Sequence, residues 1–127
     1  TPRLSAAQKD ASETVLATLN AGECTPLRLQ DLPEAVDLSP RLVDEALELL
    51  IASDDVVRVN KELFYSTSQI NALQARLVAY LESNEIMDTS AFKELTGASR
   101  KWTIPLGEYF DRIHLTIRVG NDRRLRR

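Results

Sequence analysis

The chain of 127 residues contains a single cysteine, Cys24, and a single histidine, His114. One cysteine permits no internal disulfide, and such a composition is typical of a reducing compartment, so we expect a cytoplasmic protein. One cysteine and one histidine also cannot supply the Cys/His ligands of a zinc site, and we predict neither a metal nor a cofactor. No apolar run approaches the roughly 18 residues that span a membrane, so we expect no membrane contact.

The residue patterns of common catalytic sites are missing as well. The four glycines form no glycine-rich phosphate loop. Nothing in the spacing of serine, threonine, cysteine, lysine and histidine indicates a nucleophile beside a base. His114 lies in a short link between a predicted helix and a predicted strand, where a polar surface role is favoured. We therefore expect a monomeric binding protein and not an enzyme.

Positive charge is concentrated at one end of the chain. From Ala98 to Arg127 there are eight Lys or Arg against three acids, a balance of +5. The whole chain carries −3, so residues 1–97 carry −8. A basic end on an acidic protein favours an anionic partner, and phosphate is the most favoured one. The cations are Arg100, Lys101, Arg112, Arg118, Arg123, Arg124, Arg126 and Arg127.

The predicted elements occur twice, with an offset of 60 residues. Ser39-Pro40 and Ser99 each have the residue types of a helix start. Each helix is followed by two short β-like runs, which predict a hairpin. The predicted helices are 5–20, 33–36, 39–52, 68–82, 89–96 and 99–112, the segments 27–33 and 86–88 are extended, and the hairpins turn at 60–62 and 120–122.

This order of elements is that of a winged helix-turn-helix. We predict a mainly α chain with small β-hairpins (α+β), built as two tandem winged helix-turn-helix domains at residues 1–66 and 67–127. The first domain is acidic, and Leu63-Phe64 stand where the second has Arg123-Arg124. A spacer or packing role fits the first domain better than a phosphate contact.

The second domain carries the predicted binding residues. Ser99 as cap leaves the first helix amides pointing outward, where the helix dipole favours an anion. Arg100 and Lys101 occupy the first two helical positions, and we expect Pro105 to bend this turn and aim both side chains. Trp102 and Ile113 are predicted to face the core. Arginines on the hairpin form a second clamp, because Arg can pair with phosphate or a base edge.

The last 31 residues resemble one known family. The segment Gly97-Ala-Ser-Arg-Lys-Trp-Thr-Ile-Pro-Leu-Gly-Glu-Tyr-Phe-Asp-Arg112, followed by Thr116-Ile-Arg-Val-Gly-Asn-Asp-Arg-Arg124, is similar to the last winged helix of SelB, the bacterial selenocysteine-specific elongation factor. Gly107 departs from the family's leucine, Ile117 stands where arginine is common, and Asn121 changes the turn.

The resemblance implies a function. It implies binding of a messenger-RNA stem-loop, the SECIS element, which tethers a GTP-dependent elongation factor and its selenocysteinyl-tRNA at a UGA codon on the ribosome. The GTP-binding segment would belong to the parent protein. By motif, the RNA-contact residues implied are Ser99, Arg100, Lys101, Arg118, Gly120, Arg123 and Arg124.

Two other functions stay open at this stage. A winged-helix DNA-binding regulator would prefer duplex DNA and form a dimer on two half-sites. A protein-interaction module would show no salt-sensitive binding to a polyanion. The RNA sequence recognised, the angle between the domains and the role of the first domain do not follow from the sequence.

Overall fold

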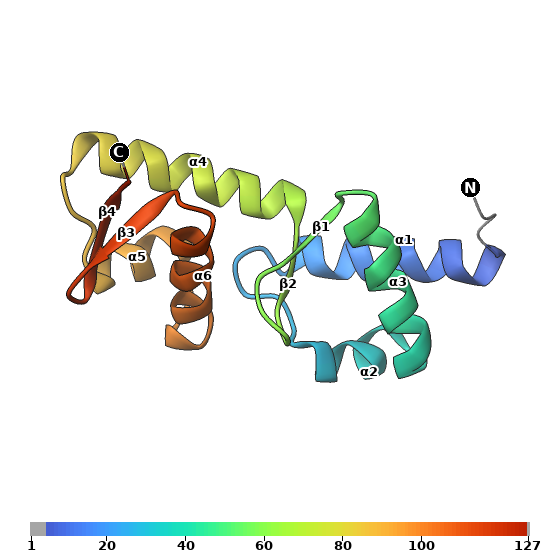
Figure 1. Ribbon diagram of the computed structural model, residues 1–127. Coiled ribbons are helices and arrows are strands. Elements are labelled where there is room, and N and C mark those ends of the chain that lie inside the picture. Colours follow the sequence, from blue (N-terminus) through green and yellow to red (C-terminus); the bar gives the residue numbers. More distant parts are fainter. Residues whose placement is uncertain (1–4, 127) are drawn as a thin grey trace. The chain divides into compact units, whose positions relative to one another are not determined.

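The computed structural model describes residues 5–126, so Arg127 lies outside the described residues. The chain divides into two compact units, Thr1–Ile70 and Asn71–Arg127 (Figure 1). The division falls inside one helix, four residues after the predicted boundary at 66/67. Each unit combines helices with one two-stranded antiparallel hairpin.

The first unit begins with helix α1 (Ala6–Ala21), and Ser5 and Gln8 form a reciprocal capping box at its start. A 3₁₀ turn (Leu29–Asp31) leads directly into α2 (Leu32–Val36). The extended segment predicted at 27–33 is therefore limited to the residues before Leu29. Helix α3 (Pro40–Ala52) begins after Ser39, whose side chain accepts from the amide of Leu42. The hairpin pairs β1 (Val56–Arg58) with β2 (Phe64–Ser66).

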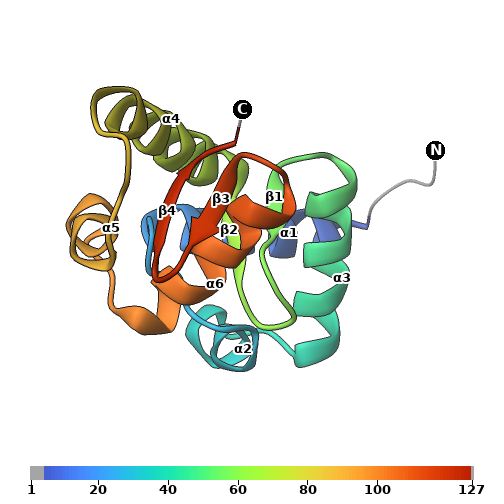
Figure 2. The ribbon, with the colours of Figure 1, turned by 60° about the vertical axis from the view of Figure 1, so that its left-hand side comes forward.

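The second unit follows the same order. Helix α4 (Thr67–Ser83) leads to Met87, whose backbone pairs with that of Arg123, as its predicted extended form requires. Helix α5 (Thr89–Thr96) is capped by Asp88 and ends at Gly97 in the left-handed conformation. Helix α6 (Arg100–Arg112) and the hairpin of β3 (Thr116–Val119) with β4 (Asp122–Leu125) complete the unit. Figure 2 shows this hairpin beside α6.

Residues 40–50 of helix α3 and 100–110 of helix α6 have the same burial pattern, position by position, at the 60-residue offset. Two residues past the end of each helix stands a residue with positive φ, Asp54 (62°) and His114 (64°). The repeat read from the apolar residues is thus present in the packing of the two units. The equivalent buried pairs are Val43 and Thr103, Ala46 and Leu106, Leu47 and Gly107, and Leu50 and Phe110.

That buried stripe corrects two predictions for α6. Trp102 is half-buried, like its equivalent Leu42, and is not at the centre of the core. Ile113 is 41% exposed, so its predicted place in the core is wrong. The stripe passes through Thr103 and Gly107, which sequence reasoning left out because neither is a large apolar residue.

The second hairpin is one residue shorter than the first. Val119 pairs with Asp122, so its turn is Gly120-Asn121 and Asp122 belongs to β4. In the first hairpin the amide of Val59 bonds the carbonyl of Leu63, which leaves a turn of three residues. The predicted three-residue turn at 120–122 is therefore wrong. Strand register also makes Arg123, opposite Arg118, equivalent to Phe64, opposite Arg58.

Tyr65 ties the first hairpin to the loop after α1. Its side chain is buried, and its hydroxyl donates a hydrogen bond of 2.9 Å to the carbonyl of Cys24. Burial raises the pKa of Tyr65 well above that of a free tyrosine, so the side chain is neutral at physiological pH. Cys24 is also buried, and over residues 5–126 no helix is long and apolar enough to cross a membrane.

Candidate nucleic-acid interface

A groove in the second unit brings together three elements. It has a volume of about 360 Å³ and lies between α5, α6 and the β3–β4 hairpin. Four of the side chains that line it are cationic and one is acidic, so its charge suits an anion. The lining residues are Thr89, Lys93, Arg100, Ile104, Glu108, Arg118, Asn121 and Arg123.

The start of α6 leaves donors directed away from the helix. The carbonyl of Ser99 accepts from the amides of Trp102 and Thr103, both at 3.0 Å. The Ser99 hydroxyl forms no capping bond with the helix, unlike that of Ser39 in the first unit. Arg100 is exposed beside these first amides, which form the positive end of the helix dipole. This arrangement favours a phosphate at the tip of α6.

Lys101 extends the cationic surface beyond the groove. Its side chain is exposed, and its Nζ lies 5.0 Å from the centroid of the Trp102 ring. A lysine over an indole face is held by cation–π attraction. The half-buried Trp102 thereby fixes where the ammonium group is presented, next to Arg100.

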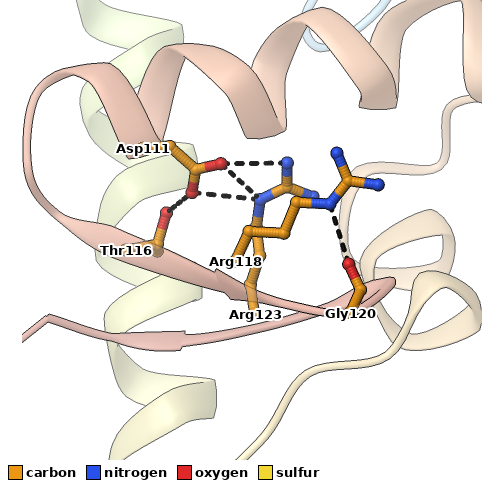
Figure 3. A network of polar contacts seen from close by, with 5 residues as sticks. All are labelled: Asp111, Thr116, Arg118, Gly120 and Arg123. Carbon is orange, nitrogen blue, oxygen red and sulfur yellow. Dashed lines mark hydrogen bonds and ion pairs between the residues drawn. The ribbon is translucent and has the colours of Figure 1, made fainter.

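Arg118 provides the cation of the hairpin on the groove side. It is exposed, and its Nε donates to the carbonyl of Gly120 at 2.8 Å (Figure 3). Gly120 has φ of 64° at the first position of a two-residue turn, which is a glycine conformation. The bond fixes Arg118 to the tip of its own hairpin, so that less side-chain freedom is lost on binding.

Arg123 is held inside the protein. Its Nε lies 3.1 and 3.2 Å from the two carboxylate oxygens of Asp111, and its Nη2 lies 3.1 Å from Oδ2 (Figure 3). Only 14% of its side chain is exposed. The hydroxyl of Thr116 donates to Asp111 Oδ1 at 2.6 Å. Of the arginines predicted to bind, this one is already paired with an internal carboxylate.

Arg124 lies on the opposite face of the hairpin. Successive side chains of a strand point to opposite faces, so Arg124 and its cross-strand neighbour Ile117 face away from Arg118 and Arg123. They line a separate pocket together with Glu82 and Glu85. The structure therefore brings Arg100, Arg118 and Arg123 to one groove but does not bring Arg124 there.

Helix α5 contributes residues that sequence reasoning missed. Thr89 and Lys93 are four residues apart, which places them on one face of the helix, and both are exposed toward the groove. The available signal was a pair of polar residues at a spacing of four, next to the buried Phe92 and Thr96 on the helix surface. Ile104 is 46% exposed and lines the same groove, which accounts for its place outside the core.

The second unit is similar to winged helices of one family. Residues 79–125 match the family model described as the winged helix of elongation factor SelB. A selenocysteine-specific elongation factor from Desulfomicrobium baculatum is 30% identical over 90 residues, which is 71% of this chain. The chain spans 14% of that relative's length.

Solved structures extend the similarity to nearly the whole chain. The mRNA-binding domain of E. coli SelB, solved in complex with SECIS RNA, matches with a TM-score of 0.82 at 22% identity, over 98% of this chain and 100% of that one. A bacterial selenocysteine-specific elongation factor, EF-Sec, matches with a TM-score of 0.70 at 26% identity, over 98% of this chain and 20% of that one. The mainly helical structure with small antiparallel hairpins is thus a winged-helix fold, and residues 79–125 match the family of SelB winged helices.

Proposed function

We propose that this chain binds a messenger-RNA stem-loop through the groove and the α6 start of its second unit. The observation that carries the proposal is the convergence of Lys93, Arg100 and Arg118 on one groove beside the positive end of a helix. Three cations from three elements can follow a curved phosphate backbone. The proposed role is binding, without catalysis and without a cofactor.

Folded RNA fits this surface better than duplex DNA. The major groove of an A-form helix is too narrow for a recognition helix to enter, so a protein must hold the backbone and read unpaired bases. The cations lie at the tip of α6 and on the hairpin, and the middle of the exposed α6 face carries Ile104 and Glu108, which suit no phosphate. This distribution favours contact through the helix tip.

The RNA is proposed to be a SECIS hairpin. The E. coli domain with the matching fold was solved with SECIS RNA, and the relative from Desulfomicrobium baculatum is named a selenocysteine-specific elongation factor. By that likeness the chain would tether such a factor in the cytoplasm to the messenger at a UGA codon on the ribosome. GTP binding would belong to other parts of the parent protein.

The proposed architecture is two tandem winged helices, divided near residues 66/67. The shared burial pattern of α3 and α6 and the two hairpins support it. We assign the contacts to Ser99, Arg100, Lys101, Arg118, the Gly120 turn and Lys93. The first unit would act as a spacer, and Arg124 would lie outside the contact because it faces Glu82 and Glu85.

The test is a double substitution, Arg100→Ala with Lys101→Ala, in the full chain. Both side chains are exposed, so the free energy of unfolding should change by less than about 0.5 kcal/mol. Affinity for a SECIS hairpin RNA should fall by more than roughly tenfold, and the slope of log K against log salt should become shallower by about 2.

A parallel titration with duplex DNA of equal length separates the other classes of partner. Tighter binding to the duplex would point to a DNA regulator, and no salt-sensitive binding to either would point to a protein-interaction module. Unchanged RNA affinity in the double variant would refute the proposed interface.

A further inference from the structure

The ion pair of Arg123 and Asp111 occupies positions that hold apolar residues in the first unit. Asp111 is equivalent to Ile51 and Thr116 to Val56 at the 60-residue offset, and strand register makes Arg123 equivalent to Phe64. Val56 and Phe64 belong to the hydrophobic core of the first unit. The fold is therefore built in one unit with apolar residues at positions where the other has a salt bridge.

Stability does not explain this difference. Replacing a partly buried ion pair with well-packed apolar residues is often neutral or stabilising. The side chains of Arg123 and Asp111 are only 14% and 26% exposed, so the pair loses much of its hydration. The ion pair of Arg123 and Asp111 is better explained by its effect on the position of neighbouring side chains.

Gly107 makes the space for this arrangement. A Cβ at position 107 would lie 2.6 Å from Arg123 Cζ and 2.7 Å from its Nη1. The guanidinium therefore lies directly against the backbone of α6. The equivalent residue of the first unit, Leu47, fills this place with an apolar side chain. Gly107, which weakens a helix by about 1 kcal/mol relative to Ala, is explained by the close approach of Arg123.

The neighbour that the pair affects is Arg118. Arg118 and Arg123 are direct cross-strand partners, and like charges at such positions repel. Asp111 neutralises Arg123 from the side of α6, which leaves Arg118 as the groove's exposed hairpin cation (Figure 3). In the first unit the residue opposite Arg58 is Phe64 and not a second arginine. The guanidinium of Arg58 lies 5.8 Å from the centroid of that ring, so no like charges meet there.

We propose that Asp111 is a positioning residue for RNA binding: with Thr116 and Gly107 it seats Arg123 on α6, fixes the β3–β4 hairpin and directs Arg118 into the groove. This inference rests on the proposed function. It makes an acidic residue necessary for binding a polyanion, against the simple expectation that removing a negative charge strengthens such binding. It also assigns Arg123 a structural role in place of a phosphate contact.

The test compares full-chain variants in binding to a SECIS hairpin RNA. Asp111→Asn should bind roughly tenfold more weakly than the wild type. The hairpin is held in place by Arg123 and Asp111 in the wild type, whereas in the variant it would have to be ordered on binding. Asp111→Glu, which keeps the carboxylate, should recover most of the loss. Glu94→Gln removes the same charge from an exposed position on α5 outside the groove and should bind as tightly as the wild type or slightly more tightly.

A second substitution displaces Arg123 without touching Asp111. Gly107→Ala pushes against the flexible end of the arginine and not against backbone, so the chain should remain folded. It should also bind RNA roughly tenfold more weakly. The Arg123 Nε–H donates to Asp111 in the wild type, so in both Asp111→Asn and Gly107→Ala its NMR signal should shift and its proton should exchange faster.

The outcomes separate the inference from the proposed function. If the wild type and Glu94→Gln bind RNA while folded Asp111→Asn and Gly107→Ala bind equally or more tightly, the positioning role is wrong and Arg123 is itself a ligand or irrelevant. If the wild type does not bind RNA, the proposed function fails whatever the NMR signal shows.

Discussion

At the residue scale, two arginines of one hairpin pair have different environments. Arg118 is exposed and bonded to its own turn, whereas Arg123 is enclosed by Asp111 and the backbone at Gly107. Adjacent Arg124 faces a third environment beside Glu82 and Glu85. Counting arginines along the sequence therefore overstates the number of phosphate ligands, because alternation along a strand and internal carboxylates divide them.

Lys93 gives a prediction at this scale. Lys93→Ala should weaken binding to a SECIS hairpin RNA by roughly three- to tenfold and make the salt slope shallower by about 1, because the groove loses one phosphate contact. Lys61→Ala is the matched control, since it removes an equal charge from the exposed hairpin turn of the first unit. Fluorescence anisotropy titrations at several salt concentrations measure both. Equal losses in the two variants would show that general charge and not the groove is responsible.

At the element scale, the helices before α3 and α6 end alike but with different residues. Asp37 ends α2 with φ of 55°, and Gly97 ends α5 with φ of 66°. Both conformations are left-handed, where a residue with a Cβ is strained and glycine is not. These caps set the turn that leads into Ser39 and Ser99. The turn before α6 is thus built from the less strained residue.

Exchanging the cap residues tests this reading. Gly97→Asp should lower the free energy of unfolding by about 1 kcal/mol. Asp37→Gly should raise it by less than that, because glycine relieves the backbone strain but also increases the conformational entropy of the unfolded chain. An added Cβ at Gly97 meets no atom within 4 Å, so the cost would come from backbone strain alone. Denaturant unfolding measures both variants. A stabilised Gly97→Asp would contradict the argument.

At the scale of the whole molecule, the two units carry net charges of opposite sign. Residues 1–70 contain six basic and twelve acidic residues, for −6, and residues 71–127 contain ten basic and seven acidic residues, for +3. The acids of the first unit include Asp44 and Glu48 on α3, on the face that corresponds to Ile104 and Glu108 of α6. Only the second unit is suited to a polyanion.

The salt dependence of binding should reflect that division. With three to five phosphates contacted, log K against log salt should have a slope of roughly −2 to −5 for the full chain. Removing two negative charges from the first unit with Asp44→Asn and Glu48→Gln should leave the slope unchanged, because the slope counts the phosphates contacted. A slope that changes by a unit or more would place RNA on the first unit.

Local residue chemistry was sufficient for the elements. The side-chain cap of Ser39 and the left-handed Gly97 fix helix ends within a few neighbouring residues, and the structure confirms α3 at Pro40–Ala52 and α6 at Arg100–Arg112. The repeat and the concentration of charge are also linear properties of the chain. The helices, the hairpins and the basic region therefore followed from the sequence.

Only the tertiary structure decided which charges are available. The pairing of Arg123 with Asp111 joins residues 12 apart through strand register and a helix face, and the shorter turn at Gly120-Asn121 shifts that register by one residue. Lys93 reaches the groove because α5 packs beside α6. A sequence shows how many charges a chain carries, but a charge paired inside the protein and a charge open to a ligand differ only in three-dimensional contacts.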